Sequence, residues 1–112
     1  MNLTIELEGK PPVWAKDAIH YFENEHSEQW IALVVEDRLL ISGLDIGWEV
    51  IEFTLEQARA ELDHVMGGKK DKKNDYPLDK WILNKAELFW VLSVIQSSLI
   101  SMEWRRRKLE EK

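Results

Sequence analysis

Two glutamate–histidine pairs have the spacing at which a helix presents metal ligands. They are Glu23–His26 and Glu61–His64. Side chains at positions i and i+3 share one face of a helix, and two-metal sites in four-helix bundles recruit glutamate and histidine in this way. Much of this chain favours strands, however, and its 14 glutamates make such a spacing an expected coincidence. We therefore expect no metal site and no cofactor.

Asp45 is the acidic residue whose setting most resembles a catalytic site, because it lies between Gly43 and Gly47. Aspartate between glycines is also typical of an ordinary turn, which is the simpler explanation. The two glycines lack the Gly-Lys-Ser/Thr ending of a phosphate loop. The absence of cysteine excludes thiolate catalysis, disulfides and cysteine-bound metal. We predict no catalytic residues and no enzymatic activity. A small enzyme that uses Asp45 or the Glu-x-x-His pairs is the alternative hypothesis.

The segment near the C-terminus is the most informative part of the chain. It carries no charge between Glu87 and Glu103. Its uncharged stretch of 15 residues is shorter than the roughly 20 residues of a membrane span, so it predicts a long helix in a folded protein. One stripe of this helix is expected to be the core face. The stripe consists of Leu88, Leu92, Ile95 and Leu99, with Val91 and Met102 at its edge.

The opposite side of this helix lacks the charges of an ordinary surface helix. Serines at four-residue steps would let another backbone approach closely, and large apolar side chains flank them. Such a patch is unusual on a soluble monomer, so we predict that it binds a protein. The predicted partner-binding residues are Phe89, Trp90, Ser93, Val94, Ser97, Ile100, Ser101 and Trp104.

Three occupants of that side are open at this point. Other helices of the same chain would cover it in an ordinary fold. A second copy or a different protein would cover it in a binding module, and a homodimer is the default because symmetric dimers dominate soluble assemblies. A peripheral membrane protein would present it to lipid.

The sequence pattern also predicts the elements that position this helix. Residues 3–8, 30–35, 38–42 and 48–53 favour strands of a small antiparallel sheet. Residues 13–25 and 55–66 have apolar side chains at helical spacing. Capping-box pairs, Thr54 with Gln57 and Asn84 with Glu87, mark the starts of the second of these helices and of the long one.

The predicted fold class is α+β, with about four antiparallel strands packed by two short helices and one long C-terminal helix. We expect residues 1–112 to form a single globular domain with a charged loop at 69–75. The long helix begins at residue 80 or 85 and runs toward residue 109 in this interpretation.

The charge distribution bears on the class of partner. The net charge of -6 argues against binding to nucleic acid or anionic membranes. Residues 1–68 carry a balance of -10 and residues 69–112 a balance of +4, which favours head-to-tail or antiparallel self-association. The lack of cysteine and of a secretory signal pattern favours the cytoplasm. The sequence therefore predicts a non-enzymatic protein-binding module, such as an inhibitor or an immunity-like acidic protein, that self-associates or docks a protein through its C-terminal helix.

Overall fold

The computed structural model describes residues 10–69, 76–81 and 83–111. One antiparallel sheet holds four strands in sequence order, namely β1 (His20–Glu23), β2 (Gln29–Val35), β3 (Arg38–Gly43) and β4 (Ile51–Phe53). The described residues also contain two α-helices, α2 (Leu55–Val65) and α3 (Lys85–Glu110). Within the same ranges there are three short 3-10 helices, η1 (Val13–Asp17), η2 (Leu44–Ile46) and η3 (Pro77–Lys80). The predicted α+β class is confirmed.

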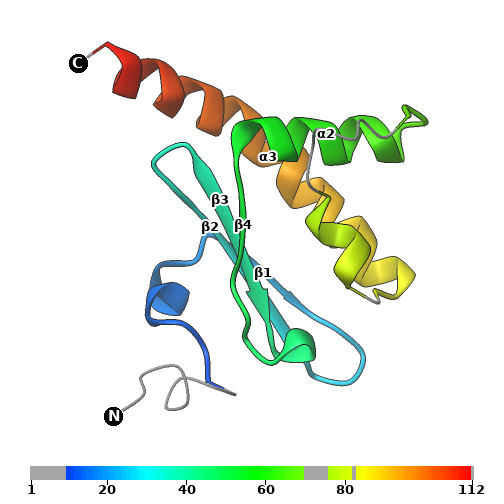
Figure 1. Cartoon of the computed structure of the whole chain (residues 1–112). Helices are drawn as coiled ribbons and strands as arrows, with labels where there is room; N and C mark the ends of the chain where they lie inside the picture. The colour runs from blue at the N-terminus through cyan, green and yellow to red at the C-terminus, as the bar shows by residue number, and fades with distance from the viewer. Residues whose placement is uncertain (1–9, 70–75, 82, 112) are drawn as a thin grey trace.

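The helices and the sheet form two layers. Both α2 and α3 lie on one face of the sheet, and η1 lies on the other (Figure 1). Strand β2 is an inner strand, as its continuous apolar run predicts, and it pairs with both β1 and β3. The two-residue connection Glu36–Asp37 joins β2 to β3, with Glu36 at a left-handed φ of 55°.

Alternate residues of the strands supply the core beneath the helices. On the sheet, Trp30, Leu39, Ile41 and Phe53 are fully buried, and Val91, Ile95 and Met102 of α3 are buried against them. Trp30 can lie across the neighbouring strand only because residue 43 is glycine. A Cβ at Gly43 would be 2.6 Å from the Trp30 ring. The indole therefore lies over Gly43 of β3, and its N–H reaches Glu87 in the first turn of α3.

The capping predictions are confirmed for both α-helices. The Thr54 hydroxyl accepts from Gln57 N, and Asn84 Oδ1 accepts from Glu87 N at 2.8 Å, each with the reciprocal bond. The long helix therefore begins at Lys85, since residues 77–80 form the separate turn η3.

Two predicted elements differ from the structure. Residues 13–25 do not form a helix but divide into η1 and the edge strand β1. The aromatic pair Tyr21–Phe22 favours a strand. In the extended conformation this segment pairs with β2. The strand predicted at 48–53 is shorter, because Trp48 adopts a positive φ of 61° after η2. The predicted strand at 3–8 and most of the charged loop at 69–75 lie outside the described residues.

The core face of α3 is rotated from the predicted leucine stripe. Its buried line comprises Glu87, Val91, Val94, Ile95, Ser98 and Met102. Leu88 is 36% exposed, and Leu92 and Leu99 are half-buried and pack against the edge of the core. The polar residues Glu87 and Ser98 on the buried line explain why the predicted core face was wrong. A hydrophobicity pattern assigns glutamate and serine to the surface.

An arginine joins the C-terminal half of α3 to two other elements. Arg106 donates to Asp37 in the β2–β3 turn and to Glu56 Oε1 at 2.9 Å in the first turn of α2. This arginine lowers the pKa of Asp37 and brings the pKa of Glu56 down to about 2. The network therefore fixes the far end of α3 against the sheet and α2.

We expect Arg106→Gln to lower the free energy of unfolding by about 1 kcal/mol at neutral pH, since it breaks a two-carboxylate network. Glu56 has a depressed pKa in the folded state, so its contribution is present above pH 4.5 and is lost as pH falls toward 2. Thermal unfolding of parent and variant between pH 7 and pH 3 measures this. The difference in Tm should shrink as the pH drops.

The matched control is Arg105→Gln, which removes the same charge from an exposed position on the same helix. It should leave Tm close to that of the parent at every pH. Equal losses from both variants would mean that net charge, rather than the Arg106 network, is responsible.

Candidate functional site

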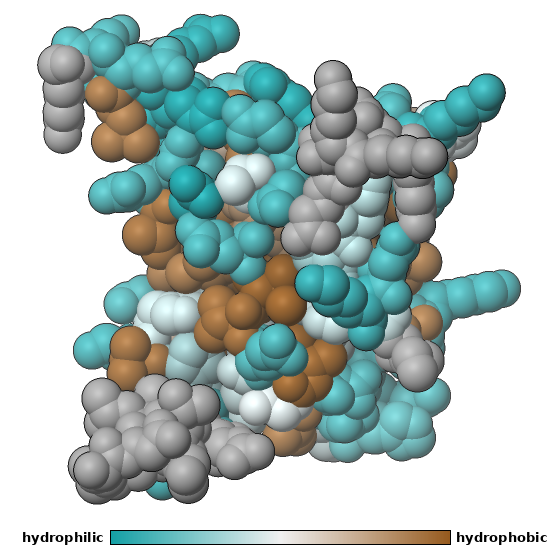
Figure 2. Space-filling view, in the orientation of Figure 1, coloured by the Kyte–Doolittle hydropathy of each residue, from teal (hydrophilic) through white to brown (hydrophobic). Residues whose placement is uncertain are grey.

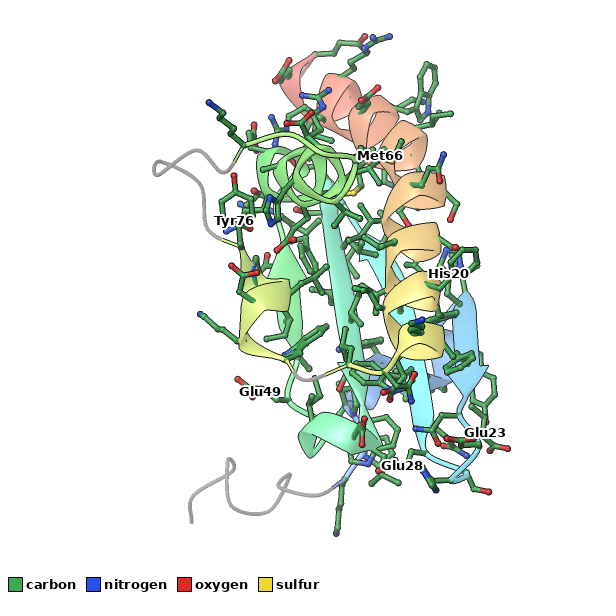
Figure 3. All side chains as sticks on the ribbon, turned by 90° about the vertical axis from the view of Figure 1, so that its right-hand side faces the viewer. His20, Glu23, Glu28, Glu49, Met66 and Tyr76 are labelled. Atoms are coloured by element: carbon green, nitrogen blue, oxygen red, sulfur yellow. The ribbon has the colours of Figure 1, made fainter. Side chains whose placement is uncertain are left out.

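A line of large side chains faces outward along α3. Phe89 is 75% exposed, Ile100 is 78% exposed and Trp104 is 58% exposed. Together with the exposed Ser93 and Ser97 they form what we call the outward stripe. At 100° per residue these five positions lie within an arc of about 80°. Figure 3 shows α3 along the front of the sheet with α2 beside it. The exposed fractions show that α2 leaves the stripe uncovered.

The other predicted binding residues lie away from this stripe. Val94 is 2% exposed in the core and is not available to a partner, so its place in the predicted set is wrong. The rotation of the core face, which places Val94 beside Val91 and Ile95, is the reason. Trp90 and Ser101 are half-buried at the edges. That the remaining residues bind a partner stays a prediction.

A hollow adjoins the N-terminal half of the outward stripe. It has a volume of about 590 Å³ and is lined by Phe22, Lys85, Ala86, Phe89, Trp90 and Ser93. Phe22 of β1 stacks on Trp90 with the ring centroids 5.9 Å apart, and the tilted rings of Trp90 and Trp30 have centroids 6.3 Å apart. Phe22 and Trp90 thus connect the hollow to the core through Trp30. Phe89 and Ser93 line the hollow from the exposed side of α3.

The serines of the stripe have their hydroxyls hydrogen-bonded within the helix. Ser93 Oγ donates to the Phe89 carbonyl at 2.9 Å, and Ser97 Oγ donates to the Ser93 carbonyl at 2.8 Å. A polar group that already has a partner costs less to remove from water than one without. An apolar surface can therefore cover the stripe with only a small desolvation penalty from the two serine hydroxyls.

A second group of side chains gathers where α3 begins, around the buried carboxylate of Glu87. Trp30 Nε1 donates to Glu87 Oε2 at 2.7 Å, and Asn24 Nδ2 donates to the same oxygen at 3.2 Å. Glu87 is only 2% exposed. Burial opposes its ionisation, but hydrogen bonds outweigh this effect and lower the pKa of Glu87, the one from Asp45 being the strongest.

Asp45 of η2 is the other partner in that hydrogen bond, and its pKa shifts upward whereas the pKa of Glu87 shifts downward. The pKa of Asp45 is raised to about 7, first by the bond to Glu87, then by partial desolvation of this exposed side chain and by the neighbouring Glu28. Two carboxyl groups in contact cannot both ionise freely, so they hold one proton between them until near neutral pH. Asp45, which the sequence marks as site-like, therefore does have an unusual environment.

The two Glu-x-x-His pairs are separate from this group and serve other contacts. Glu23 and His26 are exposed in β1 and the following turn, not on a helix. Glu61 Oε1 accepts from the Leu78 backbone N–H at 3.0 Å, and His64 packs edge-on against Tyr76. Over residues 10–69, 76–81 and 83–111, no group of three or more histidine, cysteine, aspartate or glutamate side chains could hold a metal ion.

Sequence reasoning missed two contributors to these sites. Phe22 was assigned to a helix, yet it lines the hollow from β1. Asn24 had no assigned role, yet its side chain organises the β1–β2 turn by accepting from the backbone N–H groups of His26 and Glu28. The strand-favouring pair Tyr21–Phe22, followed closely by a turn-favouring asparagine, is the signal that could have indicated β1 and its turn.

Comparison of the chain with known protein families, with curated proteins and with solved structures finds no match. Within the part of the chain that is described, the helices are too short or too polar to cross a membrane.

We expect Asp45→Asn to flatten the pH dependence of stability. Asp45 has a raised pKa in the folded state, so its stabilising contribution is full below about pH 4 and is lost as pH rises through 7. Asparagine keeps an N–H donor for Glu87 without the second charge. Between pH 5 and pH 8 the Tm of the variant should hold steady, and at pH 8 it should exceed that of the parent by about 2–4 °C.

Glu49→Gln serves as the control, because Glu49 is an exposed acid a few residues away. It should reproduce the parent's decline in Tm between pH 5 and pH 8. A decline that persists in Asp45→Asn would show that Asp45 is not the group that titrates.

Proposed function

We propose that this protein is a non-enzymatic protein-binding module, and that the outward stripe of α3 is its docking surface. The observation that carries this proposal is the exposure of Phe89, Ile100 and Trp104 along one line of a helix whose other side is buried. Single exposed apolar residues are ordinary, whereas an aligned set beside an apolar hollow is typical of an interaction site.

The energetics favour association through these residues. Full removal of a large apolar side chain from water contributes about 1.5–3 kcal/mol. Aromatic residues are the commonest anchors of protein interfaces, and the stripe presents one near each end. The acidic surplus of residues 1–68 additionally favours a basic surface on the partner, as small inhibitors and immunity proteins use.

A small enzyme built around Asp45 is the second candidate, and the pairing of Asp45 with the buried Glu87, which raises the pKa of Asp45, favours it. Its weakness is that Glu87, the natural second carboxylate, is occupied by Trp30 and Asn24. A melting screen against small-molecule ligands tests this candidate. A ligand that raises Tm in the parent but not in Asp45→Asn would support it.

The docking proposal predicts site-specific cross-linking. A benzophenone-bearing amino acid is introduced at position 100, in the middle of the stripe, and at position 49, which Figure 3 places away from α3. Irradiation in cells followed by denaturing gels should give one discrete protein adduct from position 100. Because Ile100 is already 78% exposed, the replacement should leave Tm unchanged.

Position 49 provides the background, and it should give no adduct or a different set. The same adduct from both positions, or none from position 100, would contradict docking through the stripe. Cross-linking of position 100 to lipid alone, checked by flotation with vesicles, would instead indicate a peripheral membrane protein.

A further inference from the structure

We infer that the protein docked on α3 is a second copy of this chain, with the two α3 helices antiparallel and Trp104 of each copy seated in the other's hollow. This inference rests on the proposed function and specifies its partner. Three observations support it independently: the order of residues along the stripe, the shape of the hollow, and the charges at the two ends of α3.

The stripe is self-complementary when one copy is reversed. With a two-fold axis between residues 96 and 97, Phe89 faces the partner's Trp104, and Ser93 faces the partner's Ile100. The remaining central pair is Gln96 with the partner's Ser97, both exposed. Each small residue thus meets a large or polar one, and aromatic residues meet at both ends. Phe89 and Trp104 are 15 residues apart, so the seam is about 22 Å long.

The hollow has the form that a helix offers to an incoming side chain. A knob from one helix enters a hole made by four residues at i, i+3, i+4 and i+7 of the other. Of the five α3 residues that line the hollow, Ala86, Phe89, Trp90 and Ser93 have this spacing. Lys85, at the start of α3, and Phe22 of β1 widen it. In the antiparallel register the partner's Trp104 lies opposite Phe89, directly over this hole. A volume of about 590 Å³ accommodates an indole there.

Exposed cations near the C-terminus of α3 meet acids of β1 and its turn in the antiparallel register, next to Lys85 at the start of α3. Arg105, Arg107 and Lys108 are exposed near its C-terminus. Near its N-terminus, Glu23 and Glu25 line a second hollow of about 310 Å³ together with Ala86. The same two-fold axis places the partner's Arg107 opposite Ala86, within reach of these acids. A parallel pair would instead bring the three cations of one copy against those of the other.

Mass in solution tests the second copy. Light scattering at micromolar concentration should give twice the chain mass of 13.2 kDa. Trp104→Ala should raise the dimer dissociation constant by roughly 1000-fold, because each of the two seated anchors that are lost contributes about 30-fold. Ser97→Arg places two like charges next to the axis and should give monomers that remain folded, because Ser97 is exposed. Their Tm should fall only by the stabilisation that dimerisation gives the parent. Glu49→Arg is the matched control and should remain dimeric.

Introduced cysteines test the direction, and the chain has no cysteine of its own. Ser93→Cys mixed with Ile100→Cys should form a disulfide-linked dimer under mild oxidation, seen on a non-reducing gel. Ser93→Cys alone should not, since its two copies would be about 10 Å apart along the axis, beyond the roughly 7 Å between Cα atoms that a disulfide spans. Glu49→Cys mixed with Ile100→Cys should remain unlinked.

The outcomes separate the two levels of the proposal. Disulfides from Ser93→Cys alone would indicate a parallel pair and overturn the antiparallel arrangement. A monomeric parent with a position-100 adduct to another protein would overturn the second copy and leave the docking function standing. A monomeric parent without any adduct would overturn both.

Discussion

The hydrogen bond from Trp30 to Glu87 is the interaction on which the arrangement of α3 depends. Glu87 caps the helix that it belongs to, through its bonds with Asn84, and at the same time accepts the indole N–H from β2 at 2.7 Å. Breaking a buried bond to a charged group is costly, since the carboxylate would be left without its donor. Successive residues of a helix are 100° apart around its axis. Once Glu87 points toward the sheet, the direction of every later side chain of α3 is therefore determined.

That constraint explains the outward stripe. With Glu87 inward, Val91, Ile95 and Met102 follow it into the core at helical spacing. Phe89 and Ile100 are then directed to the other side, regardless of their hydrophobicity. A helix rotated to bury the leucine stripe would have exposed Glu87 and lost its bonds to the sheet. The exposed aromatic residues are therefore a consequence of the polar contact at the start of the helix.

Local sequence signals predicted the parts of the fold that local physics determines. The capping boxes before α2 and α3 need only residues three apart, and the β2–β3 hairpin needs only two apolar runs and a short turn. The rotation of α3 and the group around Glu87 depend on residues 57 to 63 positions apart. The spacing of apolar residues along the sequence gives no information about contacts between residues so far apart. Strand β1 was missed for a related reason, because it is four residues long and takes its stability from pairing with β2.

The Arg106 network, at the opposite end of α3 from Glu87, has a consequence for binding kinetics. A helix anchored near both ends presents its side chains on a preorganised surface, so little backbone entropy remains to be lost when another molecule arrives. Rigid surfaces of this kind associate without a slow rearrangement step. In the docking proposed above, loosening Arg106 would therefore slow or weaken capture of the partner, although that residue lies outside the outward stripe.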